Sequence, residues 1–159
     1  MRDNEVMSAL KDRLRSDLTT AIKARDALRA STLRMVLTAI TNAEVAGKEA
    51  RELTDDDIVT VLQSEAKKRR ESAEAFDAGD RPELAQKERE EAVILADYLP
   101  TPLTADEVTA IVTAAVESTG AAGEGMKAMG RVMGVVTPQV KGRADGGVVA
   151  AEVKRQLGA

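Results

Sequence analysis

Apolar residues recur at spacings of three and four along most of this chain, and that period constrains its fold more than any other feature. The first such run extends from Met7 to Ile22, and the last from Val149 to Leu157. Side chains at these spacings share one face of an α-helix. No segment shows the sustained apolar–polar alternation of a strand between turn signals. The sequence therefore predicts an all-α protein.

Four helices are expected before residue 100. The first two are separated near Asp26, although no Gly or Pro marks the break. Thr54 is followed by three aspartates, which predicts a helix N-cap because acids suit a helix start. Gly79 is expected to end that helix. Asp80 is then expected to cap the next one, with Pro82 in its first turn.

Three more helices are expected after Pro100 and Pro102, which stop the preceding helix and form a stiff connector. Thr104 and Glu107 have the spacing of a complete capping box. The sequence thus predicts an N-terminal four-helix unit, residues 1–99, followed by a C-terminal three-helix unit, residues 100–159.

Composition restricts the chemistry that the chain can perform. Its 159 residues include no Cys and no His, which excludes thiolate chemistry and removes the usual general base and the commonest metal ligand. We therefore expect no catalytic residues, no metal site and no cofactor. The sequence also shows no signal peptide and no uninterrupted apolar stretch of about 18–20 residues, so we expect a cytoplasmic protein with no membrane partner.

Two groups of charged residues are interpreted as solvated helix faces. The four consecutive bases at 67–70 point nearly all the way round a helix, and acids lie at pairing distance from them. A second group contains Glu88, Glu90, Glu91 and Asp97, which we place on the polar side of an amphipathic helix.

A stripe of Met126, Met129 and Met133, ending before Pro138, is interpreted as core. A chain with one Tyr, one Phe and no Trp needs other large apolar side chains inside. The alternative is an adaptable partner-binding groove, for which Met is well suited.

The stretch 125–144 holds four bases and no acid, although the whole chain has a net charge of −4. Two glycines four residues apart would give a helix a smooth strip that a nucleic-acid or protein backbone could approach. Two cations in the following turn lie before Asp145, which can cap the last helix, an arrangement suited to phosphate. The alternative is tight helix–helix packing with incidental surface bases. The candidate phosphate-binding residues are Lys127, Gly130, Arg131, Gly134, Lys141, Gly142 and Arg143.

A second candidate basic surface comprises Lys23, Arg25, Arg29 and Arg34, opposed between residues 23 and 42 only by Asp26. The alternative is an exposed face whose arginines pair with acids of neighbouring helices.

Several motifs in order make the chain resemble the YqeY-like family, relatives of the tail domain of the GatB amidotransferase subunit. The most specific are the segments 130–134 (GRVMG) and 141–146 (KGRADG). Segments 23–26 (KARD), 31–35 (STLRM), 65–72 (EAKKRRES) and 98–100 (YLP) agree with it. The resemblance implies that the corresponding tail of the amidotransferase is a helical module that helps hold tRNA. Phosphate activation and transamidation belong to another part of that subunit, which this chain lacks.

The resemblance favours a non-catalytic module associated with tRNA or another structured RNA, working beside an amidotransferase or translation components. Because aromatic residues are scarce, RNA binding would depend on backbone and shape and would weaken with salt. Two alternatives remain open. One is an accessory component of a carbon–nitrogen ligase that uses glutamine as amido-N-donor, and the other is a protein-interaction adaptor.

Overall fold

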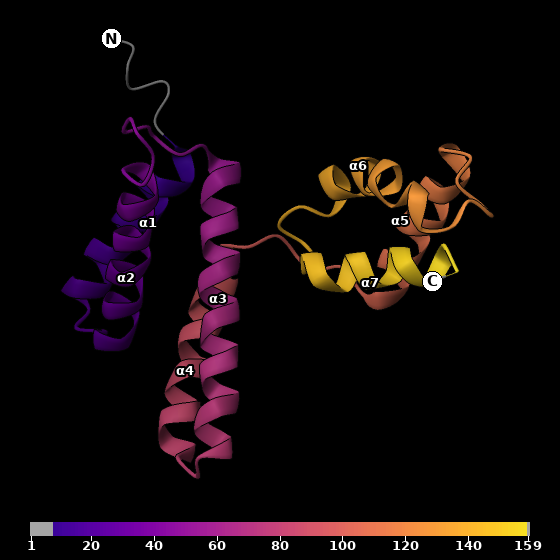
Figure 1. The fold of residues 1–159 in the computed structure, drawn as a ribbon. Coiled ribbons are helices and arrows are strands. Elements are labelled where there is room, and N and C mark those ends of the chain that lie inside the picture. Colours follow the sequence, from indigo (N-terminus) through magenta and orange to yellow (C-terminus); the bar gives the residue numbers. More distant parts are fainter. Residues whose placement is uncertain (1–7, 159) are drawn as a thin grey trace. The chain divides into compact units, whose positions relative to one another are not determined.

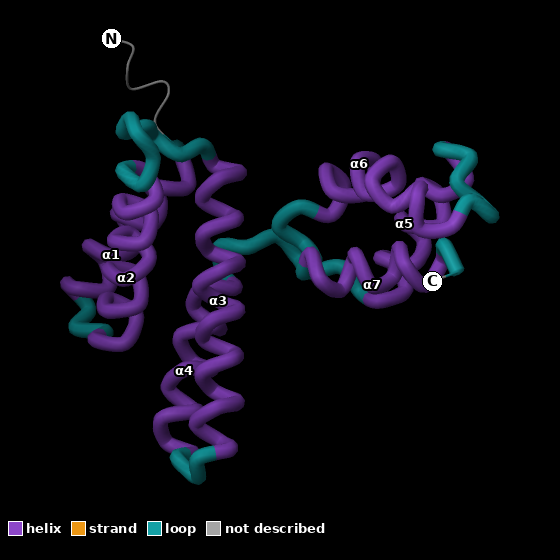
Figure 2. Tube along the Cα trace, in the orientation of Figure 1, coloured by secondary structure: helices purple, strands orange, loops and turns teal. Residues whose placement is uncertain are grey.

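The computed structural model describes residues 8–158, and the described residues contain helices and no strand (Figures 1 and 2). The all-α prediction is confirmed. Met7, expected in the first apolar run, lies outside the described residues. The chain divides into two compact units, Met1–Leu99 and Pro100–Ala159.

Seven α-helices and one short 3-10 helix, η2, make up the described fold. In the N-terminal unit, α1 and α2 form one helical hairpin, and α3 and α4 form another (Figure 1). In the C-terminal unit, α5 packs against both α6 and α7. The bounds are α1 (Ala9–Lys23), α2 (Ala27–Glu44), α3 (Asp55–Ala78), α4 (Pro82–Ala96), α5 (Ala105–Ser118), η2 (Gly125–Ala128), α6 (Met129–Val140) and α7 (Gly146–Gln156).

The break between α1 and α2 is made without glycine or proline. Arg25 adopts a left-handed backbone conformation with φ 59°. The chain reverses there, and the Asp26 amide donates to the Ala21 carbonyl at 2.9 Å. The Asp26 side chain then accepts from the Arg29 amide at 3.1 Å and caps α2, as the expected boundary required.

The two predicted threonine caps are confirmed, and both are full capping boxes. Thr54 accepts from the Asp57 amide at 3.1 Å while the Asp57 carboxylate accepts from the Thr54 amide at 3.1 Å. Thr104 and Glu107 make the same reciprocal pair at 3.1 and 2.9 Å. Each pair satisfies backbone donors that a helix start would leave free.

The predicted cap at Asp80 is wrong. The N-cap of α4 is Arg81, which makes no capping hydrogen bond through its side chain. Asp80 instead has φ 59° and closes α3, and the Arg81 amide donates to the Phe76 carbonyl at 2.8 Å. Asp serves here as the left-handed residue after a helix end, a position it tolerates better than most residues.

Each unit encloses its own core. In the N-terminal unit the core contains leucines and isoleucines of all four helices, including Leu14, Leu33, Ile58 and Leu95. Tyr98, two residues after the end of α4, is buried among them. Its hydroxyl donates to Asp17 of α1 at 2.5 Å. That contact fixes the end of the unit to its first helix.

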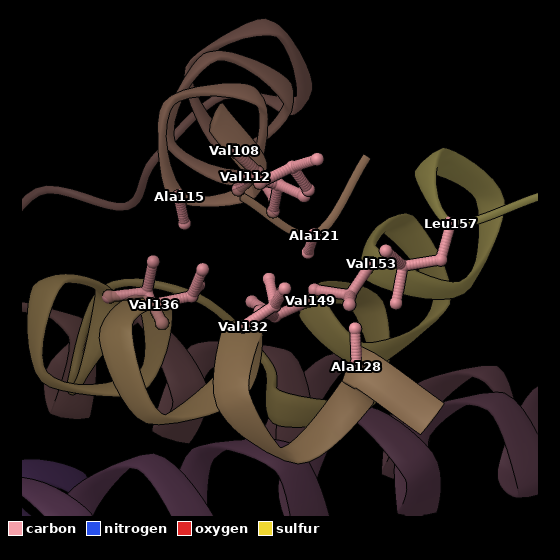
Figure 3. Packing of buried hydrophobic residues seen from close by; sticks show 12 residues of the cluster. Val108, Val112, Ala115, Ala121, Ala128, Val132, Val136, Val149, Val153 and Leu157 are labelled. Carbon is pink, nitrogen blue, oxygen red and sulfur yellow. The ribbon is translucent and has the colours of Figure 1, made fainter. Parts of the chain in front are cut away.

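Valine dominates the core of the C-terminal unit, where side chains of α5, α6 and α7 converge (Figure 3). The interpretation of the methionine stripe as core is only partly right: Met129 and Met133 pack at the edge, but Met126 is 42% exposed. The helix also continues through Pro138 to Val140. The lost hydrogen bond would leave the Gly134 carbonyl without its helical donor, and both residues are exposed, so water can replace it.

Candidate functional site

The candidate phosphate-binding residues fall on and beside α6. Lys127 lies in η2, Gly130, Arg131 and Gly134 lie in α6, and Lys141 is its C-cap residue. All five are exposed. At 3.6 residues per turn, the two glycines and Lys141 fall within about 40° of one another round the helix axis. We call these five residues the basic face of α6.

Gly130 and Gly134 face open space. A Cβ atom added at either position would meet no heavy atom within 4 Å. The alternative that these glycines allow tight packing against another helix of the C-terminal unit is therefore not what the structure shows. Both positions leave the backbone of α6 uncovered, at the usual cost in helix stability.

A carboxylate from the preceding loop contacts the basic face. Glu124 precedes η2 and accepts from the Arg131 guanidinium at 2.9 Å. That hydrogen bond, helped by the charges of Arg131 and Lys127, holds the pKa of the Glu124 carboxyl below its usual range. Within the described part of the chain, neither Lys127 nor Lys141 forms an ion pair.

The remaining two candidates, Gly142 and Arg143, build the turn between α6 and α7. Gly142 is buried with φ 79°, a conformation that favours glycine. The Arg143 side chain donates through Nε to the Thr101 carbonyl at 3.1 Å, and its own carbonyl accepts from the Leu103 amide at 2.8 Å. Arg143 thus holds residues 101–103 against this turn. A phosphate-binding role for it stays a prediction.

The residues of the second candidate basic surface differ in their ion pairs and point in different directions. Arg29 is half-buried and lies 3.7 Å from both Asp26 and Asp97. Lys23, Arg25 and Arg34 are exposed. On α2, Arg34 lies about 140° round the axis from Arg29. Arg29 is thus paired with an acid beside another helix, whereas a binding role for this surface stays a prediction.

A group of charged residues inside the α3–α4 hairpin was missed at the sequence level. Arg69 lies 3.1 Å from Glu65 on α3, 3.8 Å from Glu88 and 3.7 Å from Glu91 on α4. The four side chains are 11–21% exposed. We call them the Arg69 cluster. The interpretation as a solvated face is wrong for Arg69, Glu88 and Glu91, whereas the expected Glu65–Arg69 pairing is present. The other members of the two groups are exposed as expected: Lys67, Lys68, Arg70, Glu90 and Asp97. A signal was present, since Glu88 shares the helical spacing of the buried residues Ala85 and Leu95.

Burial and a neighbouring acid act on one carboxyl of this cluster. Burial, followed by the neighbouring Glu88 charge, raises the pKa of Glu91, and the Arg69 guanidinium opposes the rise. Arg69 Nε and Glu88 Oε2 are buried without hydrogen-bond partners. The Arg69 guanidinium also contacts the Met35 sulfur on α2, so the cluster links three helices. Among the described residues, no three acids are arranged to hold a metal ion.

Comparison with known proteins decides the family. The model of the family described as "Yqey-like protein" matches residues 11–157 of this chain. The chain belongs to the Yqey-like family. The resemblance carried by the sequence motifs is confirmed, and the match includes both units and the basic face of α6.

Three relatives show how this Yqey-like chain compares with named proteins. A protein of Pyrenophora tritici-repentis named "Altered inheritance of mitochondria protein 41, mitochondrial" is 30% identical over 151 residues, 92% of this chain and 80% of the relative. An uncharacterized protein of Schizosaccharomyces pombe is 35% identical over 88 residues, 55% of this chain and 69% of the relative. A Candida glabrata protein with the first name is 28% identical over 96 residues, 60% of this chain and 50% of the relative.

These names overturn the expected location. Two of the relatives are mitochondrial by name, so the expectation of a cytoplasmic protein is wrong. The expectation depended on the lack of a signal peptide and of a spanning stretch, which does not distinguish one aqueous compartment from another. Within the described residues, the helices are all too short or too polar to span a bilayer.

Proposed function

We propose that this protein is a non-catalytic module that binds tRNA or another structured RNA through the basic face of α6. The observation that carries the proposal is the open glycine strip at Gly130 and Gly134, flanked by Lys127, Arg131 and Lys141. Uncovered helix backbone lets a ribose–phosphate strand approach closely, and the flanking cations supply charge for its phosphates.

Binding of this kind would read backbone and shape. Tyr98 is buried in the N-terminal core, and Phe76 is the only other aromatic residue of the chain. Stacking of bases on aromatic rings, which many single-strand binders use, is therefore poorly supported. Shape-led recognition of structured RNA through phosphates and 2′-hydroxyls fits better.

The sequence supports no independent catalysis. Without His or Cys, acid–base or nucleophilic work would fall to carboxylates or amines. The carboxyl whose pKa is raised by burial, Glu91, belongs to the Arg69 cluster, where the Arg69 guanidinium lies 3.7 Å from it. We therefore propose that activity on an amide or an aminoacyl ester, if it occurs nearby, belongs to a partner.

The first prediction tests the two lysines of the basic face. Replacing Lys127→Ala/Lys141→Ala should weaken binding to bulk tRNA at least about tenfold at about 50 mM salt and reduce the salt slope by about two. Fluorescence anisotropy across a salt series measures both. The control is Lys48→Ala/Lys154→Ala, which removes the same charge from two exposed lysines elsewhere in the chain.

The control should bind tRNA with an affinity within about twofold of that of the unchanged protein, because its lysines are not on the basic face of α6. Equal losses in the two double variants would show that only net charge matters, and would contradict the proposed surface. No binding by the folded, unchanged protein at about 50 mM salt would overturn the proposed function.

A further inference from the structure

Glu124 occupies a position that sets it apart from the other acids of the C-terminal unit. The stretch 125–144 contains no acid, so the carboxylate on the basic face comes from the preceding loop. Glycines with positive φ flank it, Gly123 at 80° and Gly125 at 72°. The Glu124 amide also donates to the carbonyl of buried Ala121 at 3.0 Å. The backbone of this turn thus directs Glu124 toward η2 and α6.

We propose that Glu124 acts as a built-in counterion that occupies Arg131 in the free protein and is displaced when a phosphate backbone docks on α6. This inference rests on the proposed function. It adds a competing group to the site, because the Glu124 carboxylate and an incoming phosphate would bind the same Arg131 guanidinium.

The pair is weak enough to exchange. The Glu124 and Arg131 side chains are 36% and 47% exposed, and ion pairs in such surroundings contribute little to stability. A phosphate offers the guanidinium two oxygens in a favourable bidentate geometry and carries charge that neighbouring Lys127 also attracts. Displacement of Glu124 would therefore be favourable for a closely spaced row of phosphates, because Lys127 and Lys141 are then engaged as well.

The same arrangement discriminates between ligands. An isolated carboxylate or a single phosphate engages Arg131 without the help of both lysines. A polyanion with regularly spaced phosphates contacts all three cations, Lys127, Arg131 and Lys141. The three cations together would thus favour extended phosphate backbones over small anions, although either ligand must break the Glu124–Arg131 pair.

The test compares binding of bulk tRNA and of inorganic phosphate to the full-length protein and to Glu124→Gln. The amide keeps the size of the side chain and removes its charge. We expect tRNA binding to tighten about two- to fivefold at about 50 mM salt. The matched control is Glu117→Gln, which removes the same charge from an exposed acid on α5.

A double-variant cycle separates displacement from general repulsion. If Glu124 acts by occupying Arg131, the gain from Glu124→Gln should vanish in an Arg131→Ala background. The gain should be similar in proportion for inorganic phosphate, because the same ion pair is broken for either ligand. Far-ultraviolet circular dichroism confirms that the variants are folded.

The outcomes are distinguishable from those of the proposed function. If tRNA binds and depends on Lys127 and Lys141, but Glu124→Gln changes nothing or gains no more than Glu117→Gln, the counterion inference is overturned alone. A gain that persists in full in the Arg131→Ala background overturns it equally. If no variant binds tRNA, the proposed function and the inference fail together.

Discussion

At the scale of single residues, two helix ends of the N-terminal unit depend on non-glycine residues in the left-handed conformation. Arg25 and Asp80 both have φ 59°. That conformation brings Cβ close to the following carbonyl and costs about 1–2 kcal/mol for most residues, less for Asp. Arg25 therefore stores more strain than Asp80, and glycine at either position would avoid it.

Replacing Arg25→Gly should raise the free energy of unfolding by about 1 kcal/mol, since the left-handed conformation costs glycine nothing and only part of the gain is offset by chain entropy. Urea denaturation followed by circular dichroism measures the change. Arg25→Ala is the control, because it removes the same charge and keeps the strain. A gain of equal size in Arg25→Ala would assign the effect to charge and contradict the backbone argument.

At the scale of helices, the Arg69 cluster places three carboxylates against one guanidinium inside the α3–α4 hairpin. Burial and Glu88 raise the pKa of Glu91, while Arg69 and Lys87 lower it. The folded state therefore binds a proton more tightly than the unfolded chain at this position. Stability contributed by protonated Glu91 is present below the unfolded pKa and is lost as the pH rises through the folded pKa.

Replacing Glu91→Gln should remove that loss. Gln keeps a donor for Glu88 but cannot ionise, so the variant should gain stability over the unchanged protein as the pH rises above the ordinary Glu pKa of about 4.3. Urea denaturation at about pH 4 and about pH 8 gives the difference. Glu90→Gln is the control on the exposed side of α4. A difference independent of pH, or equal in Glu90→Gln, would contradict the raised pKa.

Features formed within one helix could be predicted from the sequence, whereas contacts between helices could not. The caps at Thr54 and Thr104 were predictable because a capping box forms between residues three apart. The Arg69 cluster was not, because its acids and its guanidinium meet only when α4 packs on α3. The candidate surface lies between these cases. Helical spacing gathers Gly130, Gly134 and Lys141 on one face, but only the fold shows that this face is uncovered.

At the scale of the whole molecule, each of the two compact units has its own core. The chain also contains a natural reporter for one of them. Its one Tyr is Tyr98, buried in the N-terminal unit, and there is no Trp. Tyrosine fluorescence therefore follows the N-terminal unit, whereas circular dichroism follows the helices of both.

Core substitutions should separate the two units. Val132 is fully buried in the core of the C-terminal unit, and Val132→Ala should destabilise that unit by about 2 kcal/mol through lost burial and a small cavity. We expect part of the urea transition seen by circular dichroism to move to lower urea, while the Tyr98 transition stays in place. Leu62→Ala, in the N-terminal core, should move the Tyr98 transition instead. If Val132→Ala shifts both signals together, the units unfold as one cooperative body, and each core depends on the other for its stability.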